Sequence, residues 1–270
     1  MADQRLKIGR IPFANLFPIF QTLEKEFDCS LYEFIDGVPS RLNDMLREGT
    51  IDLSPSSSVE YLRNPSLYRF IEGISVSSMG PVGSIFLFST KPIERLGGGI
   101  VCVTSQSATS VALLDVVLKR FYGIEYSSKV SENPFLANAD AFLLIGDEAL
   151  MYGSMQNKGA AELAGYMYRY DLGQVWYEKT GLPFVFALWI VRKEVYDITD
   201  TRHDIFEKFV SDLMAAKQQA LLNLEKIADQ SSIKNFLQRD EIIAYWNMLD
   251  YELTEEHKKG LDLFKKYMFA

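Results

Sequence analysis

The sequence predicts an α/β protein of two lobes with mainly parallel sheets. Short apolar runs alternate with amphipathic helical stretches along most of the chain, the pattern of strands connected by helices. At 270 residues and 48% hydrophobic composition, the chain can bury two ordinary cores without disulfides or metals. Two stretches rich in turn-forming residues, "STKPIERLGGGI" at 89–100 and "EKTGLPFVFALW" at 178–189, interrupt the pattern. We interpret them as two crossings between the lobes, which together form a hinge.

Short apolar runs predict the strands, and helices fall between them. The expected strands are 6–11, 31–35, 51–53, 85–89, 100–103, 141–145 and 185–191. In the first lobe, amphipathic helices are expected at 16–27 and 38–47, each beginning just after a strand at a polar or Pro-containing turn. Such turns lie at the carboxyl ends of strands, where open α/β sheets bind their ligands.

The stretch "CVTSQSATSVALLDVVL" at 102–118 begins as a strand and ends as a helix. Ser107 or Thr109 is the expected N-cap, because a hydroxyl there satisfies an orphan amide of the first turn. One cap accounts for one hydroxyl, whereas Thr104, Ser105, Ser107, Thr109 and Ser110 all lie at this junction. Amides, hydroxyls and the positive end of a helix dipole also form sites for carboxylates or phosphates. From this segment alone, both interpretations stay open.

After residue 192 the sequence becomes strongly helical. One apolar face of a long helix is marked by Phe206, Phe209, Leu213, Ala216, Ala220, Leu224 and Ile227, and further helices are expected at 242–249 and 261–267. We expect these apolar faces to pack in a core. The expected domains are a discontinuous lobe of residues 1–90 and 186–270, which includes the C-terminal helices, and an inserted α/β lobe of residues 91–185.

Composition excludes several classes of partner. A formal net charge of −8 argues against nucleic acid and anionic membranes as partners, although local amides and one Arg can still hold an anion in a pocket. Cys29 and Cys102, each in an apolar context, are expected to be buried free thiols in a reducing compartment. Neither a secretory signal nor a run long enough to cross a bilayer is evident in the sequence. We therefore expect a cytoplasmic protein that does not bind membranes.

Four further turns carry polar residues at strand ends. They are "GRIPFANLFP" at 9–18, "GVPSRLN" at 37–43, "DLSPSSSVEY" at 52–61 and "LLIGDEAL" at 143–150. Their polar or backbone-exposing residues are Arg10, Asn15, Ser40, Ser56, Ser57, Gly146 and Asp147. Each turn alone is a common cap or turn signal. Their recurrence in both lobes suits a cleft that binds a small ligand with carboxylates.

Other familiar chemistries lack their motifs in this sequence. A Walker loop, a GxGxxG at the first strand, an HExxH and a GxSxG elbow are all missing. The "GGG" at 97–99 precedes a strand and is expected to be a loop. His203 and His257 fall in the helical C-terminal part, where exposed or packing roles are expected. We therefore expect neither a metal site nor a catalytic histidine.

Five separated blocks resemble one family in the same order along the chain. The blocks are "GVPSRLNDMLREGTIDLSPSSSVEY", "GPVGSIFLFS", "SQSATSVALL", "LLIGDEAL" and "YDLGQVWYEKTGLPFVFALW". They resemble the chorismate dehydratase family of the futalosine route to menaquinone, over residues 6–192. The resemblance implies a two-lobed type II periplasmic-binding-protein-like fold with a ligand cleft between the lobes. Ala14 stands where the family would have Leu, which bears on pocket shape; Asn15 and Pro18 keep their expected places.

The resemblance also implies a reaction. Enzymes of this family are carbon-oxygen lyases that eliminate water from chorismate to give 3-[(1-carboxyvinyl)oxy]benzoate, and they require no cofactor. By this resemblance, Asn15 is the leading catalytic candidate and Asp147 the second. The expected substrate-binding residues are Arg10, Ser40, Ser56, Ser57, Ser84, Ser107, Ala108, Thr109 and Gly146.

Three alternatives remain from the sequence. The sister dihydroxynaphthoate synthase of the same pathway would share the fold, but it is expected to use a histidine in the cleft. A non-catalytic small-carboxylate-binding protein would share the two lobes, but it is expected to carry an export signal. The ligand-sensing domain of a cytoplasmic regulator would need a DNA-binding or signalling segment. The oligomeric state is not predicted.

Overall fold

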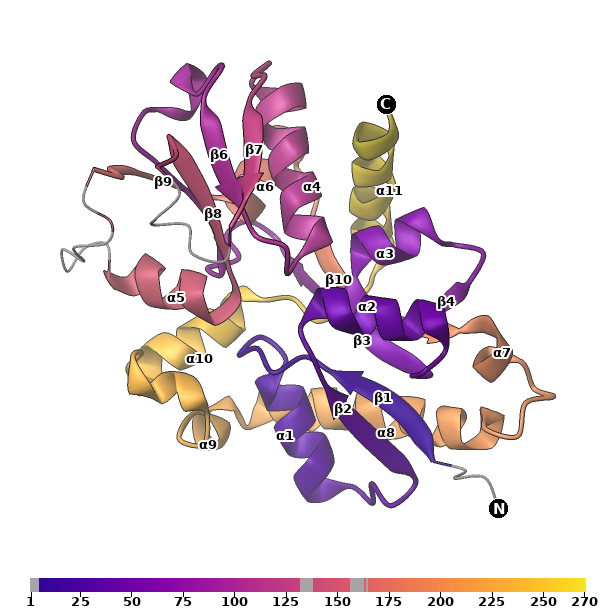
Figure 1. Ribbon diagram of the computed structural model, residues 1–270. Coiled ribbons are helices and arrows are strands. Elements are labelled where there is room, and N and C mark those ends of the chain that lie inside the picture. The colour runs from indigo at the N-terminus through magenta and orange to yellow at the C-terminus, as the bar shows by residue number, and fades with distance from the viewer. Residues whose placement is uncertain (1–4, 132–137, 156–162, 164) are drawn as a thin grey trace. The chain divides into compact units, whose positions relative to one another are not determined.

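The structure is a computed structural model, which describes residues 5–131, 138–155, 163 and 165–270 (Figure 1). Within these residues the chain divides into two compact units. Unit 1 comprises Met1–Val76, Ala187–Trp246 and Tyr251–Leu253, and unit 2 comprises Ser77–Phe186, Asn247–Asp250 and Thr254–Ala270. Each unit is built around its own mixed sheet.

Within its described residues, unit 1 contains a sheet of order β2-β1-β3-β10-β4. Its strands are β1 (Leu6–Arg10), β2 (Tyr32–Asp36), β3 (Leu53–Ser57), β4 (Tyr68–Ser78) and β10 (Phe184–Arg192), the last two continuing into unit 2. The strand β1 is parallel to β2 and β3, whereas β10 is antiparallel to β3. The side chains of β3 are all buried, so this strand lies in the middle of the core.

Besides its sheet, unit 1 contains helices, several of which are labelled in Figure 1. They are α1 (Phe17–Glu26), α2 (Pro39–Glu48), α3 (Ser58–Arg63), α7 (Lys193–Tyr196), α8 (His203–Leu222), α9 (Leu224–Ala228), η6 (Ser232–Asn235) and α10 (Arg239–Met248). The helices α1 and α8 pack against each other and on one face of the sheet, where Phe20 meets Phe34 and Tyr32 meets Phe209. The apolar face predicted for α8 is therefore core, as expected.

Within its described residues, unit 2 contains a sheet of order β7-β6-β8-β5-β9. Its strands are β5 (Ile85–Ser89), β6 (Ile100–Val103), β7 (Ser127–Val130), β8 (Ala141–Ile145) and β9 (Tyr168–Asp171). The strand β6 is parallel to β7 and β8, and β5 is antiparallel to both β8 and β9. Its helices are η1 (Ile93–Arg95), α4 (Ala108–Asp115), η2 (Val116–Phe121), α5 (Gly146–Met155), α6 (Leu172–Thr180) and α11 (Glu255–Phe269).

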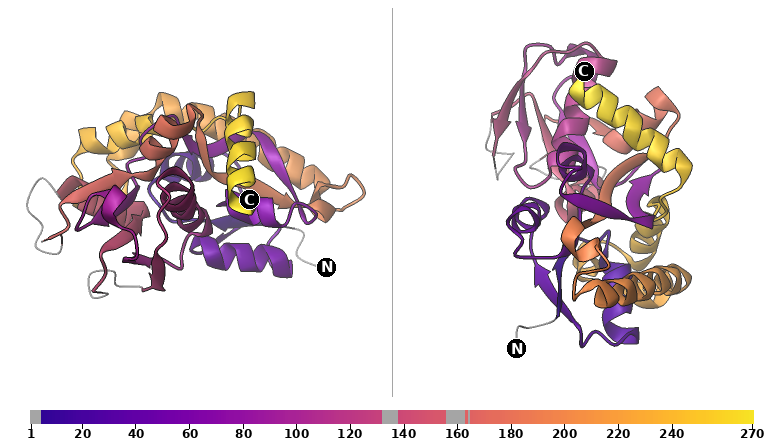
Figure 2. Two further views of the ribbon diagram at one scale, coloured as in Figure 1. Left: turned by 90° about the horizontal axis from the view of Figure 1, so that it is seen from above. Right: turned by 90° about the vertical axis from the view of Figure 1, so that its right-hand side faces the viewer.

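The C-terminal helix α11, the yellow helix that ends at the label C in Figure 2, packs in unit 2 against η2. Phe264 of α11 lies against Trp176, and Tyr267 lies against Phe121 of η2 at a ring separation of 5.5 Å. The backbone of Gly260 comes so close to the Pro183 carbonyl oxygen that a Cβ would lie 2.1 Å from it. A side chain at Gly260 is therefore incompatible with this packing.

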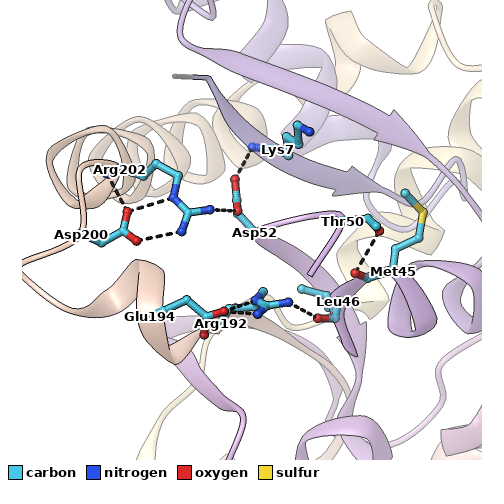
Figure 3. A network of polar contacts seen from close by, with 9 residues as sticks. All are labelled: Lys7, Met45, Leu46, Thr50, Asp52, Arg192, Glu194, Asp200 and Arg202. Carbon is cyan, nitrogen blue, oxygen red and sulfur yellow. Dashed lines mark hydrogen bonds and ion pairs between the residues drawn. The ribbon is translucent and has the colours of Figure 1, made fainter. Parts of the chain in front are cut away.

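Polar contacts anchor α8 at the amino end of the sheet of unit 1 (Figure 3). The buried Asp52 carboxylate, just before β3, accepts a hydrogen bond from the Lys7 amide at 2.8 Å and pairs with Arg202. Arg202 also pairs with Asp200 at 2.8 Å. Burial raises the pKa of Asp52, and the Lys7 amide and Arg202 oppose that shift. These contacts lie at the opposite end of β1 and β3 from the turns of interest.

Several expectations about elements differ from the structure. The sheets are mixed because β5 and β10 run antiparallel to their neighbours. The strand β3 starts at Leu53 and continues through Ser57, where a turn was expected, because these hydroxyl residues are buried in the sheet. The predicted long helix ends at Leu222 and resumes as α9, since Asn223 leaves helical geometry. Cys102 is buried, while Cys29 is half-buried in the turn before β2.

The compact units differ from the expected lobes in two respects. The strand β5 was expected in the first lobe, but it pairs with β8 and β9 and lies in unit 2. The C-terminal helices were also expected together in the first lobe, whereas α11 packs in unit 2. The ligand cleft between the lobes stays a prediction.

Candidate functional site

In unit 1, polar residues lie at the carboxyl end of the sheet. Because β1 and β3 are parallel neighbours, the turn that follows β1 and the end of β3 lie at the same edge. Asn15 lies in that turn, and Ser56 and Ser57 end β3. Asn43 of α2 donates its Nδ2 hydrogen to Ser57 Oγ at 3.3 Å. Three of the residues predicted from the sequence therefore lie at this edge of the sheet, and Asn43 contacts one of them, Ser57.

Three of these side chains have buried oxygens without a partner. Among the described residues, nothing forms a hydrogen bond with Asn15 Oδ1, Asn43 Oδ1 or Ser56 Oγ, although each atom is shielded from solvent. Leaving a buried polar atom unpaired costs about 1–3 kcal/mol, so three at one edge require an explanation. A ligand group that donates a hydrogen bond would satisfy either amide oxygen, since these atoms can only accept.

The guanidinium of Arg10 is already occupied by carboxylates. It donates to Asp36 at 2.5 and 2.9 Å and pairs with Glu24, at the end of β1. The hydrogen bond to Asp36, with the help of Glu24, raises the pKa of Arg10, while burial opposes it; Arg10 in turn lowers the pKa of Asp36. A substrate carboxylate would have to compete with these two carboxylates. Ser40 lies half-buried in the first turn of α2.

In unit 2, the hydroxyl cluster forms the start of α4. Ser107 is the N-cap: its Oγ accepts from the Ser110 amide at 3.3 Å and lies 2.9 Å from Ser110 Oγ. Thr104 Oγ1 accepts from the Gln106 amide at 3.0 Å and closes the preceding turn. Thr109 is buried in the first helical turn. The prediction that Ser107 or Thr109 caps the helix is confirmed for Ser107.

A second helix start lies at the same edge of this sheet. The strands β6 and β8 are parallel neighbours, so α4 and α5 begin at one edge. Gly146 opens α5 with a φ of 61°, a value that favours glycine, and its amide donates to the Ser84 carbonyl at 2.8 Å. Asp147 is half-buried in the first turn of α5. The buried Ser84 directly precedes β5 at this edge, because β5 runs antiparallel to β8.

Asp171 was not singled out from the sequence, yet it organises this edge. Its carboxylate accepts hydrogen bonds from the amides of Val82 at 3.0 Å and Gly83 at 2.7 Å, and it caps α6 through Gln174. Burial raises the pKa of Asp171, and the hydrogen bonds from these amides oppose the shift. Asp171 thereby fixes the loop that leads to Ser84. An Asp directly before a helix is the sequence signal that could have found it.

Asn43 was also not singled out from the sequence, and the sequence pattern around it is less informative than that around Asp171. It is a buried amide side chain within a helix whose other buried positions include Leu42 and Leu46. Only the three-dimensional arrangement shows that Asn43 faces Ser57.

Neither histidine takes part in either edge. His257 is buried at the start of α11, where it forms a capping box with Thr254, and His203 begins α8. Among the described residues, no group of His, Cys, Asp and Glu side chains has a metal-binding arrangement. No helix in the described ranges is long and apolar enough to cross a membrane. The groups at both edges are chiefly amides and hydroxyls, which can hold an anion and stabilise charge that develops during a reaction.

Comparisons with known proteins agree with this fold. A family model described as menaquinone biosynthesis matches residues 6–270. A chorismate dehydratase from Thermus thermophilus is 29% identical over 95% of this chain and 93% of its own length. A chorismate dehydratase from Campylobacter jejuni is 27% identical over 96% of this chain and 95% of its own length.

Solved structures are similar to the whole chain. A protein from Archaeoglobus fulgidus has a TM-score of 0.76 at 16% identity, covering 100% of this chain and 98% of its own. The alkanesulfonate-binding protein of Xanthomonas axonopodis has a TM-score of 0.68 at 17% identity, covering 98% of this chain and 93% of its own. The predicted periplasmic-binding-protein-like α/β fold is thereby confirmed.

Proposed function

Because the chain belongs to the menaquinone biosynthesis family, whose model spans residues 6–270, we propose that it removes water from chorismate. It is therefore a carbon-oxygen lyase. Both curated relatives carry the name of this activity and align with nearly the whole chain. The proposed place of the reaction is the futalosine route to menaquinone, in the cytoplasm.

The reaction sets a limited task for the protein. Chorismate carries two carboxylates and, on adjacent ring carbons, an enolpyruvyl ether and a hydroxyl group. Loss of a ring proton and of that hydroxyl as water gives 3-[(1-carboxyvinyl)oxy]benzoate, and the new aromatic ring drives the step. The protein has to hold both carboxylates, stabilise developing charge and assist the departing hydroxide, for which oriented dipoles and one proton-transferring group suffice.

The buried, unpartnered Oδ1 of Asn15 is the observation that supports a role in this chemistry. An uncharged amide supplies one donor group and one acceptor beside the reacting carbons without repelling a dianion. We assign Asn15 the stabilisation of the leaving hydroxyl or the orientation of the proton acceptor. Asp147, in the first turn of α5, is the second catalytic candidate.

Substrate binding is assigned to residues at the two sheet edges. In unit 2, the first turn of α4, with Ser107, Ala108 and Thr109, has the amides and dipole orientation that a carboxylate requires. The other proposed contacts come from hydroxyl groups, one guanidinium and the start of α5, namely Arg10, Ser40, Ser56, Ser57, Ser84 and Gly146.

Incubation of the purified protein with chorismate tests the function. We expect stoichiometric loss of chorismate and the appearance of one aromatic product, identified by its absorbance and mass. A protein that binds chorismate without converting it would instead be a carboxylate-binding protein, and the proposed activity would be wrong.

The variant Asn15→Ala tests the catalytic assignment. We expect kcat to fall by about a hundredfold or more, with substrate affinity changed only a few-fold, because a transition-state hydrogen bond is lost. The matched control is Asn64→Ala, which removes an amide that donates to Glu60 elsewhere in unit 1. Single-turnover rates on protein shown to be folded by circular dichroism decide, and a rate near that of the wild type would remove Asn15 from the mechanism.

A further inference from the structure

Two aromatic side chains from the C-terminal part of the chain hold the turn that carries Asn15. Trp246 Nε1 donates to the Ala14 carbonyl at 2.8 Å, and the Tyr251 hydroxyl donates to the Asn15 carbonyl at 2.5 Å. Both donors are buried, and they are separated from their acceptors by more than two hundred residues of sequence. Two consecutive carbonyls of one turn are thus fixed by long-range hydrogen bonds.

The turn lacks the local group that usually fixes such a segment. Leu16 occupies the N-cap position of α1 and provides no side-chain hydrogen bond. Ser, Thr, Asp or Asn at this position normally tie the incoming chain to the first helical turn. Phe17 instead stacks on Trp246, with ring centroids 6.3 Å apart and planes inclined by 10°. The C-terminal aromatic residues therefore fix the entry to α1 from outside; they donate to carbonyls and do not accept from the first-turn amides as a cap would.

Tyr251 is itself held firmly on the edge of β4. Its carbonyl accepts from the Ser75 amide at 3.0 Å, and Ser75 Oγ donates to the Glu252 carbonyl at 2.5 Å. Lys217 of α8 donates to Glu252 at 2.7 Å and to the Gly73 carbonyl at 2.9 Å. Burial raises the pKa of Tyr251 well above its usual range, so the hydroxyl keeps the proton that it donates.

We propose that Tyr251, together with Trp246, is a positioning residue that orients the Asn15 amide for the reaction. This inference rests on the proposed role of Asn15 and extends it to a segment that has no part in the chemistry. A hydrogen bond to the backbone of Asn15 fixes the peptide from which its side chain projects. Displacements of about 1 Å at a reacting group can lower the rate about a hundredfold. Loss of the Tyr251 hydrogen bond would therefore lower the rate by displacing the Asn15 side chain.

The variant Tyr251→Phe tests the proposal, because it keeps the buried ring and removes only the hydroxyl. We expect kcat to fall about tenfold while KM stays within about twofold. The matched control is Tyr32→Phe, which removes a hydroxyl that donates to Asp212 at 2.7 Å at the opposite end of the same sheet. We expect the control to keep the wild-type kcat even if it is less stable. Equal kcat losses in the two variants would overturn the proposal.

A double variant separates positioning from an independent effect. In the Asn15→Ala background, Tyr251→Phe should change kcat by less than about twofold, because the side chain that it orients is gone. A full further tenfold loss in that background would show that Tyr251 acts by another route.

Amide hydrogen exchange without substrate tests the contact even if chorismate is not the substrate. We expect the amides of residues 15–17 to exchange at least about fivefold faster in Tyr251→Phe than in the wild type or in Tyr32→Phe. Unchanged exchange would overturn the positioning role. A wild-type protein that does not convert chorismate would overturn the proposed function alone.

Discussion

At the residue scale, the polar groups at the two sheet edges fall into two kinds. Ser107 and Thr104 are used by the fold, since both accept hydrogen bonds from nearby backbone amides. Ser56 and Asn15 have buried oxygens that find no partner among the described residues. Their positions after apolar runs singled out all four residues in the sequence. Only the three-dimensional contacts show which of them the fold uses and which have an unpaired oxygen. For the same reason the pairing of Arg10 with Glu24 and Asp36 was not predictable, because it joins three different elements.

Ser107→Ala tests whether the first hydroxyl of the cluster acts mainly as a cap. The variant loses the bond from the Ser110 amide, so we expect the free energy of unfolding to fall by about 1 kcal/mol. We expect chorismate affinity to change less than about threefold, because the backbone amides of the turn remain. Urea denaturation and calorimetric titration give the two quantities. An affinity loss of tenfold or more would make the Ser107 hydroxyl a substrate ligand.

At the element scale, short apolar runs predicted the buried strands. They missed the strands whose side chains are polar or exposed and which form by pairing with a neighbouring strand. The edge strands β7 and β9 have the sequences "SSKV" and "YRYD" and keep exposed or half-exposed side chains, so their own composition carries little strand signal. The long strand β4 contains Gly73 and charged residues, which obscure its pattern. The helix α11 was predicted near its observed place, but its association with unit 2 depends on contacts such as those of Phe264 and Tyr267.

Gly260→Ala tests the packing of α11. Alanine favours a helix interior over glycine by about 1 kcal/mol, so helix propensity alone predicts a more stable protein. The new Cβ would lie 2.1 Å from the Pro183 carbonyl oxygen, and we expect the resulting displacement to lower the free energy of unfolding by about 1–3 kcal/mol. Thermal and urea denaturation measure the difference.

The control for this variant is Gly97→Ala, where a Cβ would meet nothing within 4 Å. We expect its stability to stay within about 0.5 kcal/mol of the wild type. If Gly260→Ala were as stable as this control, α11 would not depend on the close approach to Pro183.

At the scale of the whole molecule, the α/β class was predictable and the strand directions were not. Alternating strands and helices fix the class, but β5 and β10 run antiparallel to their neighbours because of how the chain returns to each sheet. The segments that carry Asn15, Ser56 and Thr109 were found because their polar residues follow apolar runs in the sequence, although Ser56 itself lies in β3. The hydrogen bonds from Trp246 and Tyr251 to the turn that carries Asn15 were not predicted, because they join residues that lie far apart in the sequence.

The last prediction concerns whether both units serve one ligand. Ser56 in unit 1 and Thr109 in unit 2 are buried hydroxyl residues at the carboxyl ends of different sheets. In the Asn15→Ala background, which should bind chorismate without converting it quickly, calorimetric titration should give one chorismate per chain. Adding Ser56→Ala or Thr109→Ala should weaken that single binding event by about 1.5–3 kcal/mol, the cost of losing a charge-assisted hydrogen bond.

The control in this experiment is Ser66→Ala, which removes an exposed hydroxyl of unit 1 and should leave the affinity unchanged. Ser56 Oγ has no partner in the described part of the chain, so its removal should cost little stability and the affinity change can be attributed to the ligand. An effect confined to Thr109→Ala would assign binding to unit 2 alone, and two chorismates per chain would mean separate sites. If both variants lost affinity equally and still bound one chorismate per chain, one dianion would accept hydrogen bonds from residues of both units. Its affinity would then depend on residues from both units at once.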